Sequence, residues 1–101
     1  MSAYLVCRVE IRDLEAYSKY TALTPDIIAR HGGRFLVRGG DIQTLEGEPF
    51  EGRLVIVEFP DTAAVNAFYN SPEYQAAKAI REPVSTANFI VAPGVVAASP
   101  V

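Results

Sequence analysis

The sequence is poor in the side chains that most often bind metals, form disulfides or act as nucleophiles. Its 101 residues include one Cys, one His, one Met and no Trp. A single Cys cannot form an internal disulfide, which fits a reducing compartment, so we expect a cytoplasmic protein. One His and one Cys do not make a cluster with metal-ligand spacing, and one His at the end of a predicted helix offers no Ser-His-Asp arrangement. We therefore expect no metal.

Long apolar runs and a strong charge of one sign are also missing. No apolar stretch approaches the ~18 residues of a membrane span, and the N-terminus shows no segment of signal-peptide type. The formal net charge of −3 argues against nucleic acid as a partner. The glycine pairs at 32–33 and 39–40 do not open a helix after a strand, as a phosphate-binding loop would. We expect no cofactor, no nucleic acid and no membrane association.

What the chain does have is apolar and aromatic content. Half of its residues are hydrophobic, and five Tyr and five Phe are among them, which excludes a disordered chain. This length suits one domain that can build a core without disulfides. We expect a single domain over residues 1–94 and a flexible C-terminal tail over residues 95–101, where periodicity is lost.

The pattern of residues predicts the order strand–helix–strand–strand–helix–strand. Strands are expected at 3–9, 34–38, 54–59 and 88–92, and helical segments at 13–31, 61–69 and 71–81. Pro25 either kinks the first helical segment or begins a second helix within it. This order predicts an α+β, ferredoxin-like βαββαβ fold, with a four-stranded antiparallel sheet and both helical segments on one face.

Alternation along the strands divides their side chains between two faces of the sheet. The wholly apolar set, expected under the helices, is Leu5, Cys7, Val9, Phe35, Val37, Val55, Val57, Phe59, Phe89 and Val91. The opposite set is Tyr4, Val6, Arg8, Leu36, Arg38, Leu54, Ile56, Glu58, Asn88 and Ile90. An apolar face of this size usually marks an interaction surface. The same face of a second copy would cover it in an isologous homodimer.

The polar groups of this second face form the candidate site, a ligand-binding cleft between two facing sheets. They are Tyr4, Arg8, Arg38, Glu58 and Asn88. Buried charges are costly unless they pair or bind something, and guanidinium groups suit a small organic anion such as a carboxylate or phenolate. Glu58 is the candidate catalytic residue, for proton transfer. The alternative is an Arg–Glu network that only sets the register of the dimer.

Two further side chains have structural interpretations. His31 is expected to stabilise the end of a helix, where a partly positive imidazole is favoured. Cys7 is expected to be buried and therefore inert as a nucleophile.

A series of motifs resembles the family known as domain of unknown function 1330, over about residues 3 to 94. The motifs are Gly32-Gly33-Arg34-Phe35-Leu36-Val37-Arg38-Gly39-Gly40, Leu45-Glu46-Gly47, Glu58-Phe59-Pro60 and Ala67-Phe68-Tyr69-Asn70-Ser71-Pro72-Glu73-Tyr74. The resemblance implies a dimeric α/β barrel and no particular reaction. Three functions stay open: a small-molecule-binding homodimer, a cofactor-independent isomerase or monooxygenase acting on a small aromatic or acidic metabolite, and a structural dimerisation module.

Overall fold

The computed structural model describes residues 1–95, so the tail predicted from residue 95 lies outside the described residues except for Val95. The elements in chain order are β1 (Ala3–Ile11), α1 (Leu14–Thr21), α2 (Thr24–Arg30), β2 (Arg34–Arg38), β3 (Arg53–Phe59), α3 (Thr62–Tyr69), α4 (Pro72–Arg81), a short 3₁₀ turn (Glu82–Val84) and β4 (Ser85–Pro93).

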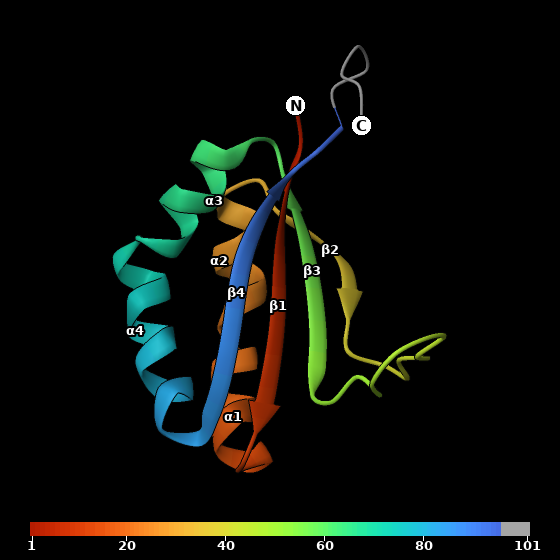
Figure 1. Cartoon of the computed structure of the whole chain (residues 1–101). Helices are drawn as coiled ribbons and strands as arrows, with labels where there is room; N and C mark the ends of the chain where they lie inside the picture. Colours follow the sequence, from red (N-terminus) through yellow and green to blue (C-terminus); the bar gives the residue numbers. More distant parts are fainter. Residues whose placement is uncertain (96–101) are drawn as a thin grey trace.

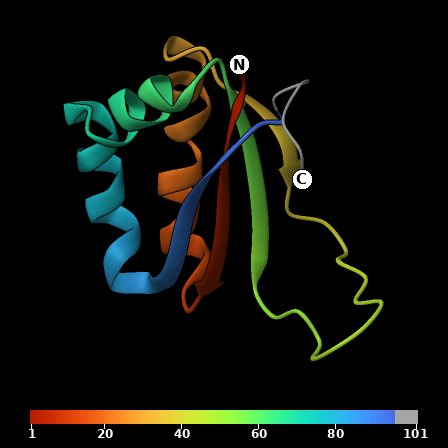
Figure 2. The ribbon, with the colours of Figure 1, turned by 45° about the horizontal axis from the view of Figure 1, so that its top comes forward.

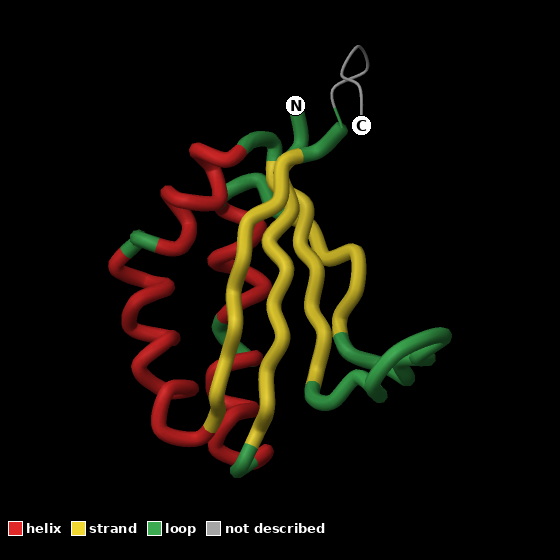
Figure 3. Tube along the Cα trace, in the orientation of Figure 1, coloured by secondary structure: helices red, strands yellow, loops and turns green. Residues whose placement is uncertain are grey.

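The strands form one antiparallel sheet in the order β2-β3-β1-β4. All the helices lie on one side of this sheet, and its other side is uncovered (Figures 1 and 3). We call the uncovered side the open face and the other side the helix face. The predicted α+β ferredoxin-like fold is therefore confirmed.

Short polar side chains begin three of the helices. Asp13 accepts a hydrogen bond from the Ala16 N–H at 3.1 Å, and Asp61 accepts one from the Ala64 N–H at 2.7 Å. Ser71 accepts from the Tyr74 N–H at 3.1 Å. Such caps satisfy N–H groups that have no partner within the helix. Pro25 lies in the first turn of α2, where its missing N–H costs nothing, so the first helical segment consists of two helices.

The core lies between the helix face and the helices. Val57 and Phe59 are each 1% exposed, and Phe68 of α3 and Tyr74 of α4 pack with their ring centroids 4.6 Å apart. His31 ends α2, and its Nδ1 lies 2.9 Å from the Ile27 carbonyl oxygen. Burial raises the pKa of the Cys7 thiol to about 12, so the neutral thiol persists at physiological pH.

One irregularity in β2 changes which side chains face the helices. Phe35 pairs with Val57, but the register then shifts, and Val37 pairs with Ile56 and Arg38 with Val55. Paired residues point to the same side of a sheet. Val37 therefore lies on the open face and Arg38 on the helix face. The sequence pattern predicts Val37 on the helix face and Arg38 on the open face. Both predictions were wrong, because strict alternation assumes an unbroken strand, whereas a bulge adds one residue to it.

The connection between β2 and β3 leaves the body of the molecule. Residues 39–52 extend away from the sheet beside the end of β3 (Figure 2). The base of this loop returns to the sheet at Phe50, whose ring lies under the Arg8 guanidinium at 4.9 Å. The loop therefore borders the Arg8 end of the open face.

Candidate functional site

The open face holds four of the predicted site residues in two pairs. Tyr4 lies opposite Glu58, and Arg8 lies opposite Asn88. Because Tyr4 and Arg8 lie toward opposite ends of β1, the two pairs are separated along the strand, with Val6 between them. The structure does not bring the predicted residues together as one cluster.

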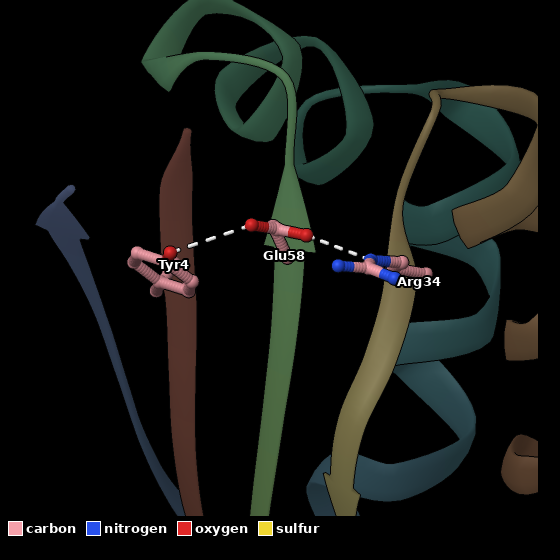
Figure 4. Close-up of polar contacts among 3 residues, drawn as sticks. All are labelled: Tyr4, Arg34 and Glu58. Atoms are coloured by element: carbon pink, nitrogen blue, oxygen red, sulfur yellow. Dashed lines mark hydrogen bonds and ion pairs between the residues drawn. The ribbon is translucent and has the colours of Figure 1, made fainter. Parts of the chain in front are cut away.

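The Tyr4 pair is part of a row across three strands. The Tyr4 hydroxyl donates to Glu58 Oε2 at 3.3 Å, and Arg34 Nε donates to Glu58 Oε1 at 2.7 Å (Figure 4). Hydrogen bonding from Arg34, and then from Ser2, lowers the pKa of the Glu58 carboxyl group. Glu58 is therefore a carboxylate with both oxygens engaged at neutral pH. This arrangement favours a role for Glu58 in pairing with Tyr4 and Arg34 over a role in proton transfer.

Arg34 is a partner that the sequence analysis missed. It begins β2 directly opposite Glu58. Arg34 lies two residues before Leu36, so strict alternation places both side chains on the same face. This spacing was the one signal in the sequence that could have indicated the contact with Glu58.

The lowered pKa of Glu58 predicts a pH dependence of stability. The carboxylate contributes stability above the pKa it has in the unfolded chain, and this contribution is lost as the pH falls through its lower folded pKa. We expect Glu58→Gln to flatten the acid limb of a plot of melting temperature against pH. The effect should be small, because the Arg34 side chain is 73% exposed.

The matched control for this measurement is Glu48→Gln, since Glu48 is exposed in the loop between β2 and β3. It should keep the wild-type pH dependence, whereas Arg34→Met should resemble Glu58→Gln. An unchanged acid limb in Glu58→Gln would show that the row across β1, β3 and β2 does not contribute to folding.

The Arg8 pair borders a hollow in the open face. The hollow has a volume of about 620 Å³ and is lined by Arg8, Glu10, Thr86, Ala87 and Asn88. Arg8 Nε donates to the Glu51 carbonyl oxygen at 3.0 Å, so the base of the loop holds the guanidinium beside the hollow. Within residues 1–95 Arg8 has no carboxylate partner. Its fork is available to a planar anion.

A separate cavity of about 40 Å³ lies behind the sheet, between the helix face and helices α1 and α2. Its lining is mostly apolar but includes two guanidinium groups, those of Arg38 and Arg53. Arg53 pairs with Val9, which is 1% exposed, so Arg53 is on the helix face. The sequence pattern predicts this strand only from residue 54, one residue after Arg53, so Arg53 is absent from the predicted site residues.

A third arginine is buried among aromatic rings. Arg81 is 5% exposed, and its guanidinium lies 4.5 Å from the centroid of the Phe89 ring. Its Nε donates to the Tyr74 hydroxyl at 3.3 Å, and this hydroxyl lies 2.9 Å from that of Tyr20. Desolvation by burial raises the pKa of both phenols, against the attraction of the Arg81 charge. This arrangement supports the core and keeps both tyrosines protonated.

Neither a metal site nor a membrane-spanning helix is found in the part of the chain that the structure describes. Between residues 1 and 95, no group of three or more His, Cys, Asp or Glu side chains is placed to hold a metal ion. Over the same residues, no helix is both long and apolar enough to cross a bilayer.

The family model of the Domain of unknown function (DUF1330) matches residues 2–95. The chain belongs to the DUF1330 family. The resemblance predicted from the motifs between Gly32 and Tyr74 is therefore confirmed. A comparison of this DUF1330 chain with curated proteins found no match.

Several solved structures share the fold of this DUF1330 chain. A protein of unknown function from Rhodopseudomonas palustris superposes with a TM-score of 0.75 at 21% identity, covering 94% of this chain and 83% of that one. SnoaB, a cofactor-independent oxygenase from Streptomyces nogalater, superposes with a TM-score of 0.65 at 16% identity, covering 98% of each chain. A dimeric ferredoxin-like protein of unknown function from Jannaschia sp. has a TM-score of 0.61 at 13% identity, covering 89% of this chain and 98% of that one. At these identities the likeness establishes the fold of the DUF1330 chain and leaves its chemistry to be argued from its own residues.

Proposed function

We propose that this DUF1330 protein is a homodimer that binds a small organic anion in a cleft between two facing sheets. The observation that carries the proposal is the open face itself, which exposes 47% of Leu36 and 52% of Ile90 and also holds the hollow at Arg8. An uncovered apolar face is unfavourable in water. The Jannaschia protein of the same fold is described as dimeric, which supports a second copy as the cover.

If two copies pack with their open faces together about a two-fold axis, each apolar side chain of this face contributes to the interface once from each copy. Val6 and Ile56 pair with each other on the two central strands, so they would lie near the centre of the interface. A stable interface of this kind buries roughly 1,200–2,000 Å² in total. The row of Tyr4, Glu58 and Arg34 carries its charges already paired, so it can approach a second sheet at lower desolvation cost than unpaired charges.

The Arg8 end of the open face is where the cleft would remain. A guanidinium group recognises carboxylates and phenolates through parallel N–H bonds, and the Asn88 amide can supply a further donor. Glu58 lies at the other end of β1 and already accepts from Tyr4 and Arg34. A doubly bonded carboxylate with a lowered pKa is a weak base, so the geometry favours binding over an isomerase or monooxygenase reaction that depends on Glu58.

The proposal predicts that Ile56→Asp produces a folded monomer that has lost the cleft. Wild type should be a dimer at micromolar concentration by light scattering and should bind benzoate in a calorimetric titration. In Ile56→Asp, two unpaired carboxylates would face each other across the interface, which should raise the dimer dissociation constant by at least about 100-fold. Arg8→Met should keep the dimer and weaken benzoate binding by about 10- to 100-fold.

The control is Leu14→Asp, which places the same charge on an apolar side chain that is 70% exposed on α1. It should stay dimeric. Ile90→Asp, at a more exposed position of the open face, replaces Ile56→Asp if that variant does not fold. A monomeric wild type would overturn the homodimer, and benzoate binding unchanged in Arg8→Met would overturn the cleft.

A further inference from the structure

The cavity behind the sheet has a charge pattern that its structural role does not explain. Its walls come from the helix face and from helices α1 and α2, and they are largely apolar. Arg38 and Arg53 both line it, and within residues 1–95 the sole ion pair is between Arg34 and Glu58. Two cations therefore share one small cavity without a carboxylate partner, where each raises the free energy of the other.

Arg53 carries the unsatisfied polar group of this cavity. Its Nε is buried and, among the described residues, has no hydrogen-bond partner. A buried N–H of a charged group without an acceptor is costly. The guanidinium is also closely enclosed, since a Cβ added to Gly39 would lie 2.9 Å from Arg53 Nη1. With a φ of +74°, Gly39 adopts a backbone conformation that suits glycine and leaves space for this group.

Arg38 reaches the same cavity because of the bulge in β2. The register places it opposite Val55, and its guanidinium lies over the Phe35 ring at 4.6 Å. Arg38 is exposed overall, so it stands where the cavity meets solvent, whereas Arg53 Nε is enclosed. A negative group that enters past Arg38 would meet Arg53 within the same cavity.

We infer that this cavity is an anion site within each subunit, which binds the carboxylate of a small organic acid between Arg38 and Arg53. The volume of about 40 Å³ is far below the ~300 Å³ of a typical drug-sized pocket. It accommodates one planar group, with the remainder of the acid directed toward Arg38. Thr24, which is 6% exposed, adds a hydroxyl group to the lining.

This site is separate from the cleft proposed between subunits. Arg53 and Arg38 lie on the helix face, whereas Arg8 and Asn88 lie on the open face. A monomer should therefore keep the anion site and lose the cleft, so the two proposals can fail independently.

The test uses propionate as the carboxylate probe, with propionamide as its neutral analogue and inorganic phosphate as a larger anion. Calorimetric titration of the Ile56→Asp monomer at millimolar concentrations should show binding of propionate and none of propionamide. Arg53→Met and Arg38→Met, each added to this monomer, should weaken propionate binding by at least about 10-fold. The matched control is Arg34→Met on the open face, which should leave propionate binding unchanged. If Ile56→Asp does not fold, the Arg8→Met dimer replaces it.

A second measurement separates a ligand site from a structural role. Without ligand, Arg53→Met should keep or raise the melting temperature, because it removes an unsatisfied buried N–H and keeps most of the apolar side-chain volume. A structural arginine would lower the melting temperature when replaced. Absence of propionate binding, equal binding of propionamide, phosphate binding in place of propionate, or unchanged propionate binding in Arg53→Met would each overturn the inference.

Discussion

Replacing Val57 by Asp should abolish soluble folding. Val57 is 1% exposed, and its cross-strand neighbours on β1 and β2 are Leu5 and Phe35 on the helix face. A carboxylate at this position would be buried among apolar side chains with no partner. Such a group costs several kcal/mol, which is comparable to the ~5–15 kcal/mol that stabilises a whole domain. Soluble yield and thermal melting followed by circular dichroism measure the effect.

The matched control is Ile56→Asp, which introduces the same side chain one residue earlier in β3. Ile56 lies on the open face, where the new carboxylate can reach water in the monomer. We expect this variant to be soluble and folded. A soluble Val57→Asp protein with wild-type melting behaviour would mean that the two faces of β3 have been assigned to the wrong sides.

Tyr74→Phe should lower the free energy of unfolding by about 2–3 kcal/mol, although it removes a single oxygen atom. Tyr74 is completely buried, and its hydroxyl accepts from Arg81 Nε. Within residues 1–95 Arg81 has no carboxylate partner, and its guanidinium lies over the rings of Phe89 and Tyr20. Removal of the hydroxyl leaves a buried cation without this acceptor. Urea unfolding at neutral pH gives the difference.

Tyr20→Phe is the control, because it removes the other hydroxyl of the same pair and leaves the acceptor for Arg81 in place. It should cost only about 1 kcal/mol. The double variant Arg81→Met/Tyr74→Phe should recover part of the loss, since the donor is then removed together with its acceptor. A loss in Tyr74→Phe no larger than that in Tyr20→Phe would show that the cation does not depend on Tyr74.

The arrangement of the fold could be predicted because its determinants are local. Asp13, Asp61 and Ser71 mark helix starts by their own chemistry, and the alternation in β1 and β3 is unbroken. Pro25 was compatible with either a kink in one helix or the start of a second helix, and the sequence alone did not distinguish between them. The structure resolves it as a new helix, since the first-turn position leaves the proline without a lost hydrogen bond.

The candidate site could be predicted only in part, because it depends on register. Tyr4, Arg8, Glu58 and Asn88 are on the expected face, since β1, β3 and β4 alternate regularly. Arg38 is not, because no Gly or Pro at the irregular position of β2 indicates a bulge. The partner of Glu58 is set by which residue of β2 lies opposite it, and a sequence alone does not contain that pairing.

The bulge makes the length of β2 as informative as its composition. Deleting Leu36 would restore regular alternation and leave Arg38 opposite Val55 on the helix face, whereas a strand of the present length without the bulge would carry Arg38 to the open face. Loss of the bulge without loss of a residue would therefore move a positive charge from the cavity behind the sheet to the open face. When members of the family are compared, a gap in β2 should be considered together with the bulge, because the two decide which face of the sheet receives the arginine.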